Sequence, residues 1–200
     1  VLSIDVEADT ATVKAEILVP SQGARFIDLF LLRKLEGEWR IVSKTATRES
    51  TPRTGDRVLL ILSSAKFHGD STLPAGVSFG EVVEAWDAFL AAGLTVDFVS
   101  PDGGAVPINV TEAGEFRSRF YDADLMYALE HTHSPSQIDP ARYRAVYFVG
   151  GSNAIYGVPE NTLLQDIAMH VYEQNGVVSA VCHGTAGLVN LKLSDGRYLL

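Results

Sequence analysis

The sequence predicts an α/β fold, a parallel sheet with helices on both faces, preceded by part of a curved antiparallel sheet. After residue 57, apolar runs typical of strands buried on both faces alternate with segments of helical periodicity. Residues 1–48 instead show short strand-like runs joined by Gly-containing turns. A polar stretch with Pro and Gly, residues 49–56, separates the two patterns and indicates a linker. We therefore expect two domains, residues 1–48 and 57–200.

Composition narrows the class of protein. The chain has 200 residues, 46% of them hydrophobic, which is enough for a substantial core. It has no 18-residue apolar run and no basic, apolar leader, so neither a membrane span nor a secretory signal is expected. A net charge of −9 argues against a nucleic-acid surface. The single cysteine excludes an internal disulfide and fits a reducing compartment, so we expect a cytoplasmic protein.

The front domain is expected to be an antiparallel meander. Strands are predicted at 11–19, 26–32 and 39–44, with hairpin connections at 20–24 and 34–38. No helical period appears, and one face of the sheet should be buried. Phe30 and Trp39 are expected to pack in that core, with a ligand pocket as the alternative. Asp28 is expected at an exposed strand position, with the lining of a pocket as the alternative.

The second domain alternates strands and helices. Its elements are predicted as strands at 58–62, 96–99, 145–149 and 177–181, and as helices at 81–92, 121–131 and 160–174. This order favours a parallel sheet whose functional loops lie at the carboxyl ends of the strands. Those loops are residues 63–80, 100–120, 150–158 and 182–184.

The only cysteine occupies the most informative position. Cys182 follows a run, residues 177–181, that we expect to be a buried parallel strand, and it precedes Gly184 and further small residues. A sharp strand-to-helix turn presents a side chain at the carboxyl edge of the sheet, near a helix N-terminus that favours a thiolate. The pattern indicates a nucleophile. A buried structural cysteine is the alternative.

Three segments of the second domain resemble the ThiJ/PfpI superfamily, whose fold is that of class I glutamine amidotransferases, and most of all its chaperone/glyoxalase III branch. They are Ala75-Gly-Val-Ser-Phe-Gly-Glu81 with Trp86 and Phe89 after it, Val99-Ser-Pro-Asp-Gly-Gly104 running on to Asn109, and Ala180-Val-Cys-His-Gly184. The resemblance covers residues 57–200 and implies a flavodoxin-like sheet with a nucleophile elbow.

The resemblance also implies roles for individual residues. Cys182 would be the nucleophile, His183 the acid and base, and Glu81 the carboxyl group that contacts the sulfur. Glu84 competes with Glu81 on composition but lies nearly one helical turn further on. The third, orienting acid of such sites would lie beyond Leu200. Because the chain starts without Met and ends in a strand-like segment, we expect a fragment that is cut at both ends, with the second domain truncated at its C-terminus.

The loop after the third strand departs from the family pattern. The family has Gly-Gly-His-Gly where this chain has Gly150-Gly151-Ser152-Asn153, and Gly157 replaces an acidic residue. Gly150, Gly151 and Ser152 are still expected to form the oxyanion and substrate loop. The backbone N–H groups of Gly151 and His183 are the candidate donors.

Residues 1–48 resemble the last strands of nuclear-transport-factor-two-like domains of the SnoaL or lumazine-binding-like type. The matching residues are Thr10, Ala11, Phe26, Asp28, Phe30, Leu32, Lys34, Gly37, Trp39, Ile41, Val42 and Lys44. The resemblance implies part of an α+β cone, in which curved sheet is wrapped by helices.

The resemblance of the second domain implies a cysteine-dependent, cofactor-free enzyme with a stress-response role. It would act on small reactive carbonyls, as a glyoxalase III or D-lactate dehydratase that makes D-lactate from methylglyoxal, or as a protein deglycase. The alternatives are a non-catalytic chaperone, a redox sensor through Cys182, and an amidase or glutamine-amidotransferase-like hydrolase. No metal is expected, because His131 and His133 lack a second ligand pair. The expected partner is a small carbonyl compound, with a homodimer left open.

Overall fold

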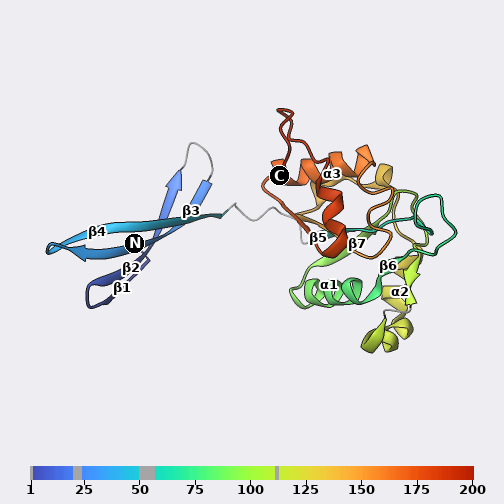
Figure 1. The fold of residues 1–200 in the computed structure, drawn as a ribbon, viewed down its shortest axis with the longest axis horizontal. Coiled ribbons are helices and arrows are strands. Elements are labelled where there is room, and N and C mark those ends of the chain that lie inside the picture. Colours follow the sequence, from blue (N-terminus) through green and yellow to red (C-terminus); the bar gives the residue numbers. More distant parts are fainter. Residues whose placement is uncertain (1, 20–23, 50–56, 111–112) are drawn as a thin grey trace. The chain divides into compact units, whose positions relative to one another are not determined.

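The computed structural model describes residues 2–19, 24–49, 57–110 and 113–200 (Figure 1). The chain divides into two compact units, residues 1–53 and 54–200, and each is described by itself. Residue 49 of the expected linker ends a strand, and residues 50–56 lie outside the described part.

Unit 1 is an antiparallel meander. Its strands, β1 (Ser3–Glu7), β2 (Thr10–Val19), β3 (Ala24–Leu35) and β4 (Glu38–Glu49), pair in the order β1-β2-β3-β4. The β3–β4 turn places Glu36 and Gly37 at φ of 53° and 87°, as a two-residue hairpin turn requires. These findings confirm the predicted meander. The other predicted turn, at 20–24, falls mostly outside the described residues.

The expected core of unit 1 is absent from its described side chains, among which only Ala11 and Asp28 are buried. Trp39 is 41% exposed and Phe30 is half-buried, so the prediction that they form a core is wrong. The described part of the unit is a single sheet, and a core needs a second packed layer. Asp28 is 1% exposed rather than exposed, with its Oδ2 2.6 Å from Nζ of Lys44.

Unit 2 is built on a parallel sheet. Its strands, β5 (Arg57–Ile61), β7 (Thr95–Val99), β9 (Ala145–Phe148) and β10 (Val177–Ala180), lie in the order β10-β9-β5-β7. The first strand therefore lies between the second and the third, as in flavodoxin-like sheets. The chain runs from β5 to β7 at one edge of the sheet, then crosses back past β5 to β9 and continues to β10 at the other edge. The structure confirms the predicted fold class.

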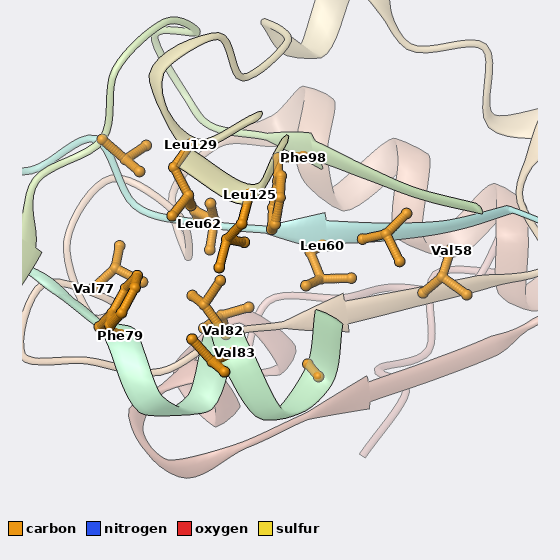
Figure 2. Close-up of a cluster of buried hydrophobic side chains, with 14 of the residues drawn as sticks. Val58, Leu60, Leu62, Val77, Phe79, Val82, Val83, Phe98, Leu125 and Leu129 are labelled. Carbon is orange, nitrogen blue, oxygen red and sulfur yellow. The ribbon is translucent and has the colours of Figure 1, made fainter. Parts of the chain in front are cut away.

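Helices cover both faces of this sheet. Val58 and Leu60 of β5 pack in one cluster with α1 (Phe79–Ala91) and α2 (Ala123–Glu130). Figure 2 shows this cluster, in which Val82 and Val83 of α1 lie on the same side of β5 as Leu60. Leu59 and Ile61 pack on the opposite face, with α3 (Thr162–Glu173). A strand that is covered on both faces needs apolar residues at successive positions, which explains the run in β5.

Two of the predicted loops contain short structured segments. β6 (Val77–Ser78) and β8 (Ile108–Asn109) pair in parallel as a separate two-stranded sheet. The described residues also include 3₁₀ helices at Gly114–Tyr121, Pro135–Gln137, Pro140–Arg142 and Cys182–Leu188, the last of which is called η6 below. A strand of two residues has no periodicity to detect, so sequence analysis assigned these segments to loops.

β10 differs from the prediction in its burial. It pairs in parallel with β9, as expected, but it lies at one of the two edges of the sheet. Val177 is 58% exposed, and the other β10 residues are half-buried. The expectation of a fully buried strand is wrong because an apolar run does not distinguish a central strand from an edge strand. None of the helices in the described ranges is long and apolar enough to cross a membrane.

A polar cluster ties three of these segments together. Nη1 of Arg57 and the hydroxyl of Tyr143 both donate to Oδ2 of Asp97, over 2.6 and 3.0 Å. Tyr143 is buried, and burial together with the Asp97 carboxylate raises its pKa well above that of a free tyrosine. The hydrogen bond that Arg57 donates to the Asp97 carboxylate raises the pKa of Arg57 as well.

Tyr143→Phe should change how stability depends on alkaline pH. A tyrosine in the unfolded chain loses its proton near pH 10, whereas folded Tyr143 keeps it, so its contribution is complete below pH about 10 and is lost as the pH rises through the raised folded value. The variant should lose about 1 kcal/mol at pH 7 through the missing hydrogen bond. The free energy of unfolding of the variant, measured in urea, should then fall less between pH 9 and 11 than that of the wild type. Parallel pH curves, or an equal effect of exposed Tyr121→Phe, would contradict this reading.

Candidate active site

The elbow is formed by a strained residue at the end of β10. Cys182 is the first residue of η6 and has φ of 49°, a left-handed conformation that costs a residue with a side chain about 1–3 kcal/mol. Its thiol is exposed. The strand-to-helix turn predicted from the sequence is confirmed, and the alternative of a buried structural cysteine is wrong.

Small residues allow η6 to pack directly on β9. A Cβ on Gly184 would collide with the carbonyl group of Phe148, and one on Gly187 would collide with the Phe148 ring. The N–H of Gly184 donates to the carbonyl of Val181 over 2.8 Å, and Thr185 Oγ1 donates to the carbonyl of Cys182 over 2.8 Å. The turn that carries the thiol is therefore held by the sheet below it.

His183 lies against the thiol. Its Nδ1 is 3.3 Å from Sγ of Cys182, within hydrogen-bonding range for sulfur, and its ring is otherwise exposed. An imidazole in this position can take the thiol proton and return it.

Glu81 reaches the same point from the first turn of α1. Its Oε2 accepts a hydrogen bond from the N–H of Gly150 over 2.9 Å. A Cβ on Gly150 would lie against this carboxylate and 2.9 Å from Cβ of Cys182, so the carboxylate and the thiol-bearing residue meet at Gly150. Glu84 is exposed to solvent. The structure thus places Glu81, rather than Glu84, beside the elbow.

The loop after β9 is pressed onto the segment before α1. Gly151, at φ of 116°, forms an isolated antiparallel bridge with Val77. The N–H of Ser78 donates to the carbonyl of Gly150 over 3.2 Å, and the N–H of Gly76 donates to Oγ of Ser152 over 3.2 Å. The predicted oxyanion and substrate loop is therefore rigidly placed beside the elbow, and the Ser152 hydroxyl is bound to the backbone before β6.

Asn153 is a structural residue that sequence analysis missed. Its side chain is fully buried, and its Nδ2 donates to the carbonyls of Ser63 and Ala65, over 3.2 and 3.0 Å. These carbonyls belong to the loop after β5, so one amide joins the loops that follow the two central strands. An amide side chain next to paired glycines at a strand end was the available signal, but sequence alone does not reveal its partner.

The Cys182 thiol and the His183 imidazole line a surface groove of about 430 Å³. It is lined by Ile155, Cys182, His183, Thr185, Ala186 and Val189. Ile155 and Val189 were not singled out from the sequence, because isolated exposed aliphatic residues are common on protein surfaces.

Gly151→Ala should destabilise unit 2 by about 3 kcal/mol, since a Cβ there would collide with the backbone of Gly76 and Ser78 and since φ of 116° disfavours a side chain. The free energy of unfolding in urea measures this effect. Gly104→Ala is the matched control, because Gly104 has φ of 73° but no atom within 4 Å of a Cβ, so only about 1 kcal/mol of backbone strain is expected. Equal losses in the two variants would show that the close packing around Gly151 is unimportant.

Comparison with protein-family models agrees with both resemblances. Residues 72–199 match the model of the DJ-1/PfpI family. Residues 1–46 match the model of a putative lumazine-binding family.

Individual relatives place the chain more closely. Glutathione-independent glyoxalase hsp3102 of Schizosaccharomyces pombe is 32% identical over 147 residues, which are 69% of this chain and 61% of that protein. Glyoxalase 3 of Candida albicans is 31% identical over 146 residues, or 68% of this chain and 61% of that protein. The chain thus spans about three fifths of the length of these relatives.

Solved structures show the same relationship. Glyoxalase III of Candida albicans superposes with a TM-score of 0.63 at 29% identity, covering 72% of this chain and 64% of that one. The 24 kDa Rapid Encystment Protein of Francisella tularensis superposes with a TM-score of 0.66 at 25% identity, covering 72% and 65%. A cysteine elbow at the carboxyl edge of a flavodoxin-like sheet, an adjoining glutamate and a match over residues 72–199 lead to one conclusion: this chain belongs to the DJ-1/PfpI family.

Proposed function

We propose that the protein is a cysteine-dependent, cofactor-free glyoxalase that converts methylglyoxal to D-lactate. The observation that carries the proposal is the exposed Cys182 thiol, 3.3 Å from the His183 imidazole, at the mouth of an open groove. The names of the relatives, glutathione-independent glyoxalase and glyoxalase 3, support a small carbonyl compound as the substrate.

The reaction needs no external oxidant. The sulfur of Cys182 adds to the aldehyde carbon while His183 takes the thiol proton and passes it to the aldehyde oxygen, which gives a hemithioacetal and restores the neutral imidazole. His183 then moves the proton on the aldehyde carbon to the neighbouring ketone carbon through an enediol, leaving a lactoyl thioester. Water cleaves the new C–S bond and releases lactate and the free thiol. The aldehyde carbon is oxidised and the ketone carbon is reduced. Overall, one methylglyoxal and one water give one lactate and one proton.

The loop beside the elbow has a supporting role in this proposal. Glu81 holds the N–H of Gly150 and so fixes the position of the loop relative to the sulfur. The N–H groups of Gly151 and His183 would stabilise the oxyanion that forms when sulfur attacks the carbonyl. Ser152 anchors the same loop through its contact with the N–H of Gly76.

The proposed activity also suggests a setting for the protein. An exposed catalytic thiol must stay reduced, which favours the cytoplasm, and removal of reactive aldehydes is a stress-response role. A homodimer completes this proposal, and sedimentation at several protein concentrations would test it.

Cys182→Ala should abolish D-lactate formation from methylglyoxal, with a loss of at least about a thousandfold, because no other thiol exists in the sequence to form the covalent intermediate. His183→Ala should lower kcat by about 10²- to 10⁴-fold, the usual contribution of a general acid and base. D-lactate is assayed enzymatically, with Leu163→Ala, an exposed position on α3, as the control. Full turnover by Cys182→Ala would disprove the assigned nucleophile.

The exposure of Cys182 favours a second candidate, a redox sensor in which the thiol is oxidised to sulfinate. Mass spectrometry after graded peroxide treatment would detect the addition of two oxygen atoms at this residue. A thiol that resists oxidation at peroxide concentrations that oxidise glutathione would eliminate this candidate and leave the enzyme.

A further inference from the structure

The groove beside the thiol has an apolar wall. Ile155 is 42% exposed and Val189 is 57% exposed, and both line the same groove as Cys182, together with Ala186. Exposed aliphatic side chains beside a reactive group leave apolar surface in contact with water. A ligand that covers this surface gains free energy in proportion to the apolar area removed from water.

The position of Ile155 is fixed by the loop that carries it. Asn153 and Ala154 are both buried, and the amide of Asn153 bonds to the carbonyls after β5. The N–H of Ala154 donates to the carbonyl of Gly151 over 3.1 Å, and that of Tyr156 donates to the carbonyl of Asn153 over 3.0 Å. Two successive anchored residues and a turn thus direct Ile155 to the surface beside the elbow.

Val189 is held equally firmly at the end of η6. Its N–H donates to the carbonyl of Ala186 over 3.3 Å, and Leu191, two residues on, is fully buried. Because η6 also begins at Cys182, the spacing between this valine and the thiol is set by a single 3₁₀ helix.

The rest of the groove lining has few polar groups that could bind a substrate, apart from the thiol and the imidazole. Among the described residues that line the groove, His183 is the only ionisable side chain besides the thiol. The Thr185 hydroxyl already donates to the carbonyl of Cys182. A charged substituent on the substrate would therefore find no countercharge on this wall, whereas an apolar one would contact hydrocarbon.

We propose that Ile155 and Val189 form a specificity wall that selects 2-oxoaldehydes with a bulky apolar substituent over small ones such as glyoxal. This inference rests on the proposed function, since it names the substrate class for that site. The aldehyde carbon is attacked by Cys182, and the substituent on the adjoining ketone carbon lies against the two aliphatic side chains.

The first experiment compares kcat/KM for phenylglyoxal and for glyoxal. Ile155→Ser and Val189→Ser should each lower the phenylglyoxal-to-glyoxal ratio by about three- to tenfold, the range expected for losing apolar contact in a partly open pocket. Leu163→Ser makes the same aliphatic-to-serine change at an exposed position outside the groove, and it should leave the ratio unchanged. A ratio that is unaltered in both groove variants would overturn the inference while leaving the proposed function intact.

A second measurement needs no turnover. Cys182 is the only cysteine, so the rate of maleimide labelling reports on this groove alone. The ratio of labelling rates for N-phenylmaleimide and N-methylmaleimide should fall by a similar factor in the two groove variants but not in Leu163→Ser. If no aldehyde is turned over, the proposed function is rejected, and the labelling ratio alone tests the apolar wall. A fall in the groove variants supports the wall, and an unchanged ratio rejects it as well. Circular dichroism melting of each variant verifies that it is folded.

Discussion

The contact on which unit 2 depends is the meeting of three segments at Gly150, where there is no room for a side chain. The N–H of Gly150 donates to Glu81 of α1, its Cα faces Cβ of Cys182, and its carbonyl accepts from Ser78. Parallel strands end at the same edge of a sheet, so β9 and β10 deliver the loop and the thiol to one place, and α1 brings the carboxylate. Only glycine lets these three segments approach so closely.

Tight packing of this kind holds Cys182 in its strained conformation. A left-handed backbone at a residue with a side chain persists only where the surroundings overdetermine it. Here Gly184 and Gly187 let η6 press on Phe148, a core residue of β9. The orientation of the thiol is thus coupled to the hydrophobic core below it, and loss of core packing near Phe148 would release the strain that keeps the sulfur exposed.

How far the sequence predicts the molecule depends on how local each signal is. The strands β5 and β9 and the elbow were predictable, because burial on both faces requires uninterrupted apolar residues and because Cys182 follows such a run directly. The exposure of Val177 and Trp39 was not predictable. An apolar side chain favours burial, but the sequence around it does not show whether another layer of the fold packs over it. Asp28 was misassigned for the converse reason, because its burial depends on Lys44 of the neighbouring strand. The candidate site shows the same division: Cys182 and His183 are adjacent in the chain, whereas the bonds of Asn153 span about ninety residues.

In the proposed function, the reacting thiol and imidazole stand on η6, whereas Ile155, one half of the proposed specificity wall, stands on the loop after β9. η6 packs on Phe148 of the sheet, and α1, which packs in the core, supplies the Glu81 carboxylate that holds the N–H of Gly150. Two of the residues that differ from the family pattern, Ser152 and Asn153, bind backbone groups of neighbouring loops and do not line the groove. Their effect on the groove is indirect, because they hold the loop that places Ile155 in its lining. Under the proposed specificity wall, a substitution in this loop would alter the preferred substituent while the sulfur and the imidazole keep their positions on η6.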